Sequence, residues 1–375
     1  MTYSSFNPPR RTLMGPGPSD ISPKVLDALS KPTIGHLDPL FIGMMDELKS
    51  LMQYAFQTKN EITLAVSAPG SAGMETCFVN LVEPGETVIV CINGVFGMRM
   101  KENVERLGAT AVVVDGEWGR AVDPVQLEAC LKAHPEAKFV AFVHAETSTG
   151  ALSDAKTLCA IAKQHDCLTI VDAVTSLGGV ELRVDDWQID AIYSGSQKCL
   201  SCVPGLSPVS FSPAAVAKIK SRKTKVQSWF LDQTLVMDYW ADNAGGKRSY
   251  HHTAPVNSLY ALHESLLNLY NEGLENAWKR HAEQHKVLAA GLAELGIKFI
   301  VPESERLPQL NAVYIPEGVD DVKVRNYLLN EFNLEIGAGL GAFAGKAWRI
   351  GLMGYSAKSE NVLLCLAALK QALKQ

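Results

Sequence analysis

Seven short apolar runs, rich in β-branched residues, occur between residues 62 and 212 of the chain. Apolar residues at helical spacing separate most of them, as in residues 124–134 and 154–164. Apolar strands that alternate with helices are typical of a mostly parallel sheet with helices packed on it. The pattern therefore predicts an α/β fold, a mostly parallel seven-stranded sheet flanked by helices. The runs are ITLAVS (62–67), TVIVCI (87–92), TAVVVD (110–115), KFVAFVHAE (138–146), LTIVDA (168–173), DAIYSGS (190–196) and PVSFS (208–212).

Other segments predict the elements around this sheet. Ser22 is a suitable helix N-cap with Pro23 at the first helical position, and residues 38–56 carry an apolar stripe at helical spacing. Helical patterns replace the alternation near residue 255, and short strands and helices then mix up to the C-terminus. We expect an arm (1–14), a large domain (15–265) and a smaller C-terminal α+β domain (266–375). The later strands are expected at 298–301, 312–315 and 348–352, and the later helices at 274–295, 322–331 and 359–373.

Two histidines on the predicted helix over 274–295 have the i,i+4 spacing of a metal-binding pair. The segment His281-Ala-Glu-Gln-His285 lacks the HExxH arrangement, and the helix has a charged outer face. We therefore predict solvated histidines and no metal site.

Composition and charge favour a globular protein and argue against nucleic-acid binding. The chain has 375 residues, of which 47% are hydrophobic and 20% charged, as in globular proteins, and its net charge of −5 does not favour nucleic-acid binding. The basic run SRKTK (221–225) is too short for a polyanion site and predicts a solvated loop.

The cysteine pattern predicts buried free thiols in a reducing compartment. Eight cysteines are scattered, and the Cys199–Cys202 pair has no second pair at zinc-ligand spacing. We see no secretory signal, no membrane-spanning apolar run and no peroxisomal C-terminal signal, so we expect a cytoplasmic protein without membrane contact.

Asp172 and Lys198 are the strongest candidates for chemistry. Asp172 ends one predicted strand, and the next predicted strand leads into the turn that carries Lys198. In open α/β sheets, ligands bind beyond the carboxyl ends of the strands. Pyridoxal phosphate needs a lysine amine for its aldehyde and a carboxylate for its ring nitrogen. Either residue alone is typical of solvated surface, but the pair favours this cofactor.

The motifs VDAVTSLGG (171–179) and YSGSQK (193–198) resemble the class V branch of fold-type I pyridoxal-phosphate aminotransferases. The alanine–glyoxylate / serine–pyruvate aminotransferase group is the most similar. The similarity extends over nearly the whole chain, through GPGPS (15–19), FQT (56–58), NG.FG.R (93–99), STG (148–150), SRKTK (221–225), YHHT (250–253), GLEN (273–276) and RIGL (349–352).

The resemblance implies roles for residues around the cofactor. The small residues of SAPGSAGMET (67–76), at a predicted helix start, favour a phosphate cradle, and the resemblance assigns its contacts to Gly70, Ser71 and Ala72. It also implies that Phe96 and Val174 pack on the two faces of the ring. The hydroxyl of Thr147 is expected near the ring's phenolic oxygen, and Gln197 at the phosphate.

Further implied residues concern the substrate and a second subunit. Arg349 matches the family residue that holds the substrate carboxylate through a planar fork, with a structural salt bridge as the alternative. Tyr250 and Thr253 match residues that reach the neighbouring subunit's phosphate, which implies a homodimer with shared active sites. His36 and Gly17 are candidates at the substrate mouth, although His36 equally suits a loop cap and Gly17 a Gly-Pro turn.

These residues predict a ping-pong transamination. Lys198 moves the Cα proton as general base, Asp172 stabilises the protonated ring, and the amino group of alanine or serine passes to glyoxylate or another small 2-oxo acid. Ureidoglycine is an alternative donor, because a purine-catabolic branch shares the scaffold. A cysteine desulfurase is less favoured because residues 337–346 contain no cysteine. A ligand sensor on the same fold is less favoured because neither end has room for a DNA-binding domain.

Overall fold

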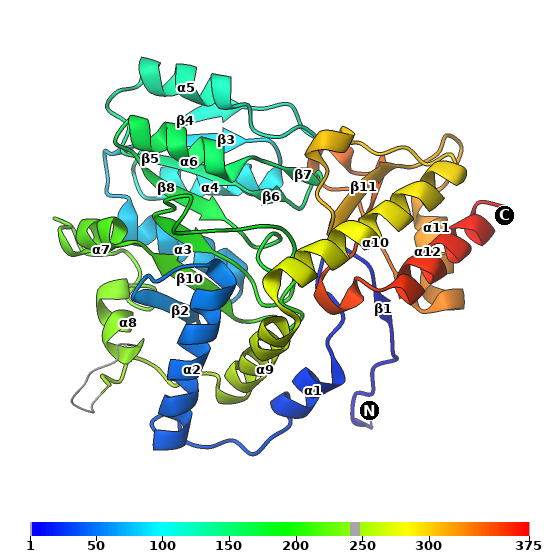
Figure 1. Ribbon diagram of the computed structural model, residues 1–375, viewed down its shortest axis with the longest axis horizontal. Helices are drawn as coiled ribbons and strands as arrows, with labels where there is room; N and C mark the ends of the chain where they lie inside the picture. Colours follow the sequence, from blue (N-terminus) through cyan, green and yellow to red (C-terminus); the bar gives the residue numbers. More distant parts are fainter. Residues whose placement is uncertain (1, 241–247, 375) are drawn as a thin grey trace.

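A seven-stranded sheet forms the centre of the large domain. The computed structural model (Figure 1) describes residues 2–240 and 248–374. The strand order is β2-β10-β9-β8-β5-β3-β4, and every neighbouring pair is parallel except the two that involve β10. All seven predicted strands are present, and the mostly parallel α/β fold is confirmed. The strands are β2 (Ile62–Val66), β3 (Thr87–Ile92), β4 (Thr110–Asp115), β5 (Phe139–Val143), β8 (Leu168–Asp172), β9 (Ala191–Tyr193) and β10 (Ser207–Phe211).

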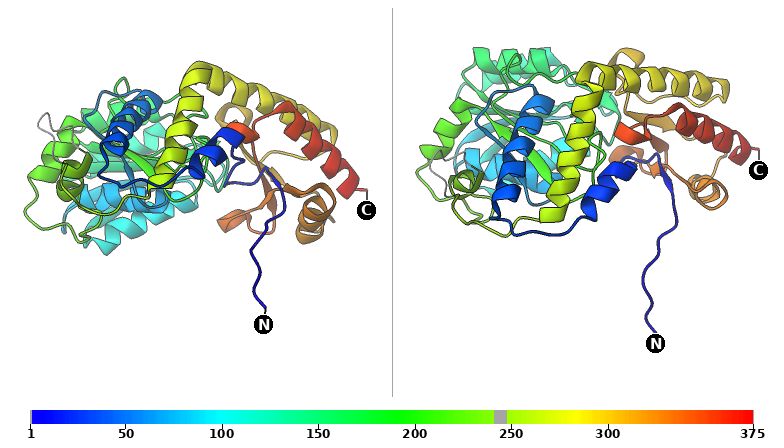
Figure 2. Two further views of the ribbon diagram at one scale, coloured as in Figure 1. Left: turned by 90° about the horizontal axis from the view of Figure 1, so that it is seen from below. Right: turned by 60° about the horizontal axis from the view of Figure 1, so that its bottom comes forward.

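Helices cover both faces of this sheet (Figures 1 and 2), and its strands are mostly apolar and buried, except for the edge strand β4. Ser22 accepts a hydrogen bond from the backbone N–H of Val25 and caps α1, as predicted. The large-domain helices are α1 (Pro23–Leu29), α2 (Pro39–Phe56), α3 (Gly70–Leu81), α4 (Val95–Arg106), α5 (Pro124–Ala133), α6 (Ala155–Gln164), α7 (Pro213–Lys220), α8 (Gln233–Trp240) and α9 (Val256–Glu272).

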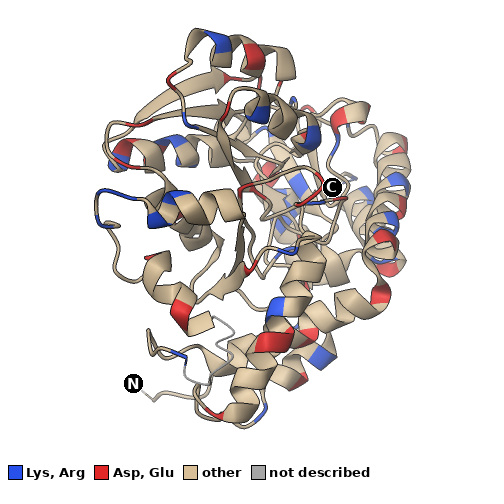
Figure 3. Cartoon of the chain, turned by 60° about the vertical axis from the view of Figure 1, so that its left-hand side comes forward, with Lys and Arg blue, Asp and Glu red and all other residues tan. Residues whose placement is uncertain are grey.

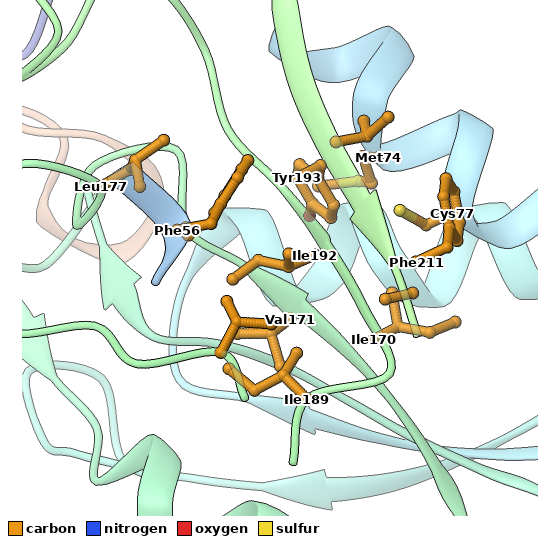
Figure 4. Close-up of a cluster of buried hydrophobic side chains, with 14 of the residues drawn as sticks. Phe56, Met74, Cys77, Ile170, Val171, Leu177, Ile189, Ile192, Tyr193 and Phe211 are labelled. Atoms are coloured by element: carbon orange, nitrogen blue, oxygen red, sulfur yellow. The ribbon is translucent and has the colours of Figure 1, made fainter. Parts of the chain in front are cut away.

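The core of the large domain lies between the sheet and these helices. Ile170, Tyr193 and Phe211 of adjacent strands pack with Met74 and Cys77 of α3 (Figure 4), and all five side chains are buried. Each such side chain stabilises the fold by roughly 1.5–3 kcal/mol. The strand ends that carry Asp172 and the Lys198 turn are thereby held on a rigid support.

A second, smaller core lies at the C-terminal end. It is built around the antiparallel sheet β11-β14-β13, with α10, α11 and α12 beside it (Figure 1). Along α10, Ala277 belongs to the large core and Leu288 to the small one. The domain boundary near residue 265 stays a prediction. The elements are α10 (Leu274–Glu294), β11 (Leu310–Tyr314), α11 (Asp321–Phe332), β12 (Leu334–Glu335), β13 (Gly337–Ala338), β14 (Ala347–Gly351) and α12 (Ser359–Ala372), with 3₁₀ turns at Glu303–Glu305, Gly341–Phe343 and Gly354–Ser356.

The N-terminal arm extends away from the body in two views (Figure 2), and residues 2–10 are exposed. Its last part differs from the prediction, because β1 (Thr12–Leu13) pairs in parallel with β12, and Met14 is fully buried in the small core. A second small ladder joins β6 (Ala145–Glu146) to β7 (Ala151–Leu152). The pairing of β1 with β12 joins segments that the sequence did not predict as strands.

The prediction of solvated histidines on α10 was wrong. His281 is 0% exposed, its Nδ1 lies 2.6 Å from the Ala277 carbonyl oxygen, and its Nε2 accepts a hydrogen bond from the Gly354 N–H. Burial lowers the pKa of His281 to about 4. His285 is partly buried, with its Nδ1 2.6 Å from Asn311 Oδ1. Contacts of this helix face with the small domain bury His281 and partly bury His285.

The predicted strand at 298–301 is also absent as an extended element. The structure has only an isolated bridge between Phe299 and Val313 there.

Charged residues of both signs are interspersed over the outer helices (Figure 3). All eight cysteines are free, and seven of them are buried. Within residues 2–240 and 248–374, His, Cys, Asp and Glu side chains form no group of three or more that could hold a metal ion. In the same ranges, no helix combines the length and apolar character needed to cross a bilayer.

Candidate functional site

Asp172 lies at the carboxyl end of β8, and its side chain ends the strand by an Asx turn. Its Oδ1 accepts a hydrogen bond from the Val174 N–H at 2.8 Å, and its Oδ2 accepts one from the Tyr193 hydroxyl at 2.8 Å. The residue is 3% exposed. Burial raises the pKa of the Asp172 carboxyl to about 7, although these two hydrogen bonds act in the opposite direction. A cationic partner in front of it would restore the charged form.

Lys198 lies in the turn after β9 and lines the same cavity as Asp172. The Ser19 hydroxyl fixes this turn by donating to the Lys198 carbonyl at 2.7 Å, and the Lys198 Nζ donates to the Pro16 carbonyl. Burial, and then the charge of Arg349, lower the pKa of the Lys198 amine to about 8. A larger share of neutral, nucleophilic amine is thus present near neutral pH than for a solvated lysine.

Gly17 contacts this lysine directly. Its φ is +110°, and a Cβ at this position would lie 2.5 Å from the Lys198 Nζ. Only glycine fits here without displacing the amine. The structure therefore brings Gly17 to the predicted centre from an element that is remote in sequence.

The cavity that contains these groups has a volume of about 250 Å³. One side of it is the start of α3, where Gly70 and Ser71 line the wall and backbone N–H groups of the first helical turn have no intrahelical acceptor. Ala72 does not line the cavity, and its N–H donates to the Pro69 carbonyl at 2.7 Å. The cradle predicted from the small residues of this loop thus opens toward the lysine.

Four further predicted residues line the cavity walls: Phe96, Thr147, Val174 and Gln197. The Thr147 hydroxyl lies 2.5 Å from that of Thr175, which holds its side chain in place. The Gln197 Oε1 is buried and has no hydrogen-bond partner among the residues that the structure describes. The cavity is thus lined by both apolar and polar side chains.

Arg349 lies on β14, next to the cavity rather than in its lining. Its Nε donates to the Ala338 carbonyl at 2.8 Å and its Nη1 to the Thr147 carbonyl at 3.2 Å. No ion pair within 4.0 Å involves Arg349 in the part of the chain that the structure describes. Burial lowers the pKa of its guanidinium to about 10, which leaves it charged at neutral pH. Its placement suits the binding of a carboxylate better than the alternative of a structural salt bridge.

Besides Gly17, Ala72 and Arg349, which lie next to the cavity lining, three more predicted site residues do not line the cavity of their own chain: His36, Tyr250 and Thr253. Tyr250 is 65% exposed, and Thr253 is exposed as well. The His36 Nδ1 lies 3.0 Å from the Tyr239 hydroxyl, and its ring is 5.5 Å from that of Tyr250. The structure does not bring this group to Lys198 within one chain.

Two residues that the sequence did not single out support the site. Tyr193 donates to Asp172, and Glu146 is a fully buried carboxyl whose pKa burial raises. The Glu146 Oε1 accepts from the Ser148 hydroxyl at 2.6 Å, and a Cβ at Gly94 would overlap its carboxyl group. Glu146 thus fixes the start of α4, which carries Phe96. The motif NG.FG.R contains that glycine but gives no signal for its partner.

The residues present fit pyridoxal phosphate. The cavity offers a buried carboxyl for a ring nitrogen, a neutralisable amine for an aldehyde, a helix start for a phosphate and apolar walls for a flat ring. The buried, unpartnered Gln197 oxygen is a further polar group that a ligand could satisfy. No metal is required by this donor set.

Comparison with known proteins shows the family of this chain. The family model described as aminotransferase class-V matches residues 13–361. The alanine–glyoxylate aminotransferase of Rattus norvegicus is 43% identical over 368 residues, which cover 98% of this chain and 88% of the relative. The (S)-ureidoglycine–glyoxylate transaminase of Bacillus subtilis is 37% identical over 383 residues, covering 97% and 91%.

A solved structure has the same fold over the full length. The crystal structure of an alanine–glyoxylate aminotransferase from Nostoc sp. superposes with a TM-score of 0.96 at 43% identity, covering 100% of this chain and 98% of that one. The chain therefore belongs to the class-V aminotransferase family and is a pyridoxal-phosphate-dependent aminotransferase.

Proposed function

We propose that this enzyme transfers the amino group of alanine to glyoxylate. The observation that carries the proposal is the single cavity lined by both Lys198 and Asp172, with the unpaired guanidinium of Arg349 beside it. The Rattus and Nostoc relatives, each 43% identical to this chain, are both named for this reaction. Serine is a second small donor that fits the same groups.

Lys198 and Asp172 have separate roles in the proposed reaction. Bound pyridoxal phosphate supplies an electron sink that acidifies the Cα proton of an amino acid. Lys198 in its neutral form takes that proton at Nζ and is the general base, for which a pKa of about 8 is well matched to neutral pH. Asp172 holds a proton on the ring nitrogen, with its orientation set by Tyr193 and Val174.

Arg349 orients the substrate. Two of its N–H groups already donate to backbone carbonyls, which hold the guanidinium in one plane. The remaining N–H groups of Arg349 are then available to the carboxylate that amino-acid donors and 2-oxo acceptors share. One residue thus serves both halves of a ping-pong reaction.

We also propose a homodimer whose active sites combine two chains. The exposed Tyr250 and Thr253, which do not line the cavity of their own chain, support this arrangement, because their side chains lie at the surface, where a neighbouring chain has access to them. His36 stays a candidate for substrate selectivity in the same shared site. For the compartment we propose the cytoplasm, because eight free cysteines suit a reducing environment.

A donor panel tests the substrate proposal. Alanine, serine and ureidoglycine are each supplied with glyoxylate, serine and ureidoglycine are also supplied with pyruvate, and the 2-oxo product of the donor is measured. We expect alanine with glyoxylate to give the highest kcat/KM. Ureidoglycine is the second candidate because the Bacillus relative is named for it. Activity with ureidoglycine alone would refute the alanine proposal, and an inert, cofactor-binding protein would favour a sensor.

A further inference from the structure

One cation of the cofactor cavity has no role in the account so far. Arg99, on α4, lines the cavity, and its Nη1 donates to the Ser71 hydroxyl at 3.0 Å. Its guanidinium carbon lies 5.0 Å from the centroid of the Phe96 ring. The side chain therefore bridges two walls, the start of α3 and the aromatic residue of α4.

The charges of the cavity show what Arg99 can contribute. Among the described residues that line it, Arg99 and Lys198 are the only cations, and Asp172 is the only carboxylate. A bound phosphate adds up to two negative charges, whereas a helix start offers only about half an elementary charge. The Lys198 amine is committed to the aldehyde end. Arg99 is the remaining cation, and it already contacts the loop that is expected to hold the phosphate.

We propose that Arg99 is a phosphate-binding residue of this enzyme. One N–H group donates to Ser71, and the other arm of its fork donates to a phosphate oxygen beside the start of α3. The short Ser71 side chain leaves room for this reach. The inference rests on the proposed placement of the cofactor in this cavity, but not on the identity of the amino donor.

A purely packing role for Arg99 predicts different behaviour. In that case the side chain only supports Phe96 through a cation–π contact, which would affect the ring whether or not a phosphate is attached. Pyridoxal, which has the ring and the aldehyde without the phosphate, separates the two roles.

The test measures the Kd of cofactor-free protein for pyridoxal phosphate and for pyridoxal by visible absorbance. We expect Arg99→Gln to weaken pyridoxal-phosphate binding about 10-fold, a modest effect because Arg99 is exposed in the single chain, while the Kd for pyridoxal is unchanged. Arg99→Lys keeps the charge and should recover most of the affinity. Lys101→Gln on the same helix, whose amine pairs with Glu105 rather than lining the cavity, is the matched control and should bind like wild type.

The proposal is overturned if Arg99→Gln weakens both ligands equally, weakens neither, or behaves like Arg99→Lys. Ionic strength gives a second readout, since the salt dependence of pyridoxal-phosphate affinity should be smaller in Arg99→Gln than in wild type. A wild type that binds the cofactor but does not use alanine would refute the proposed function and leave this inference intact.

Discussion

Replacing Asp172 with Asn should abolish transamination and, at the same time, stabilise the cofactor-free fold at alkaline pH. Asp172 is a buried carboxyl that accepts two hydrogen bonds and has no cationic partner within ion-pair distance among the described residues. Its environment suits a protonated ring nitrogen. In the cofactor-free protein the ionised carboxylate is therefore buried without a cation beside it, and this lowers the stability of the fold. Asn keeps the shape and the acceptor for the Val174 N–H, but it removes the charge.

The size of the effect follows from the pKa of Asp172, which rises from 3.8 to about 7 on folding. The native state then binds a proton between these pH values that the unfolded state does not bind. Stability that is present below pH 4 is therefore lost progressively as pH rises to 7. At about 1.4 kcal/mol per pKa unit, the free energy of unfolding of the wild type falls by about 4 kcal/mol over this pH range, whereas that of Asp172→Asn does not.

Urea unfolding of the cofactor-free proteins, followed by circular dichroism, measures this difference. From the same linkage, we expect the free energy of unfolding of Asp172→Asn to exceed that of the wild type by about 4 kcal/mol at pH 8 and by about 2 kcal/mol at pH 5. Asp190→Asn is the matched control, because Asp190 is also 3% exposed but pairs with Lys163 and accepts from the Thr169 N–H. The free energy of unfolding of Asp190→Asn should be about 1–3 kcal/mol lower than that of the wild type at both pH values. An Asp172→Asn variant whose advantage does not grow with pH would refute the reasoning.

Three further predictions concern the substrate, the lysine and the second subunit. Arg349→Gln should lower kcat/KM for alanine about 100-fold with little change in cofactor affinity. Arg349→Lys should recover only part of the lost kcat/KM, since a lysine cannot form the planar fork. Loss of the cofactor from Arg349→Gln would contradict this role. The rate at which cofactor-free enzyme takes up pyridoxal phosphate should rise with pH through about 8, where the Lys198 amine becomes neutral, and a flat stopped-flow profile would argue against that amine. Inactive Lys198→Ala and Tyr250→Ala proteins, unfolded together and refolded as mixed dimers, should regain up to about a quarter of wild-type activity, because half of the dimers then contain one intact site; no recovery would exclude shared sites.

Most of the fold could be predicted because its signals are local. The central strands are apolar runs rich in β-branched residues, and helix starts such as Ser22-Pro23 carry their caps in the adjacent sequence. The pairing of Thr12–Leu13 with Leu334–Glu335 could not be predicted in this way, since it joins the two ends of the chain through backbone hydrogen bonds. The burial of His281 has the same origin, because periodicity defines a helix face but not what packs on it.

The candidate site likewise contains residues that local sequence predicts and residues that only tertiary packing reveals. Asp172 and Lys198 follow from strand ends and residue chemistry, and the structure lines one cavity with both. Tyr193 and Glu146 were missed, because a buried tyrosine or glutamate gains its role only from the partner that tertiary packing brings to it. The roles of Tyr250 and Thr253 depend on a second chain, and they stay predictions.

The central claim is that one lysine, Lys198, bonds covalently to pyridoxal phosphate in the cavity that ends at Asp172. The most direct measurement is borohydride reduction of the cofactor-loaded enzyme, followed by proteolysis and mass spectrometry of the labelled peptide. The account predicts a single pyridoxyl modification, located on Lys198 and absent from Lys198→Ala. A modification on another lysine, or a loaded enzyme in which Lys198 stays unmodified, would contradict it.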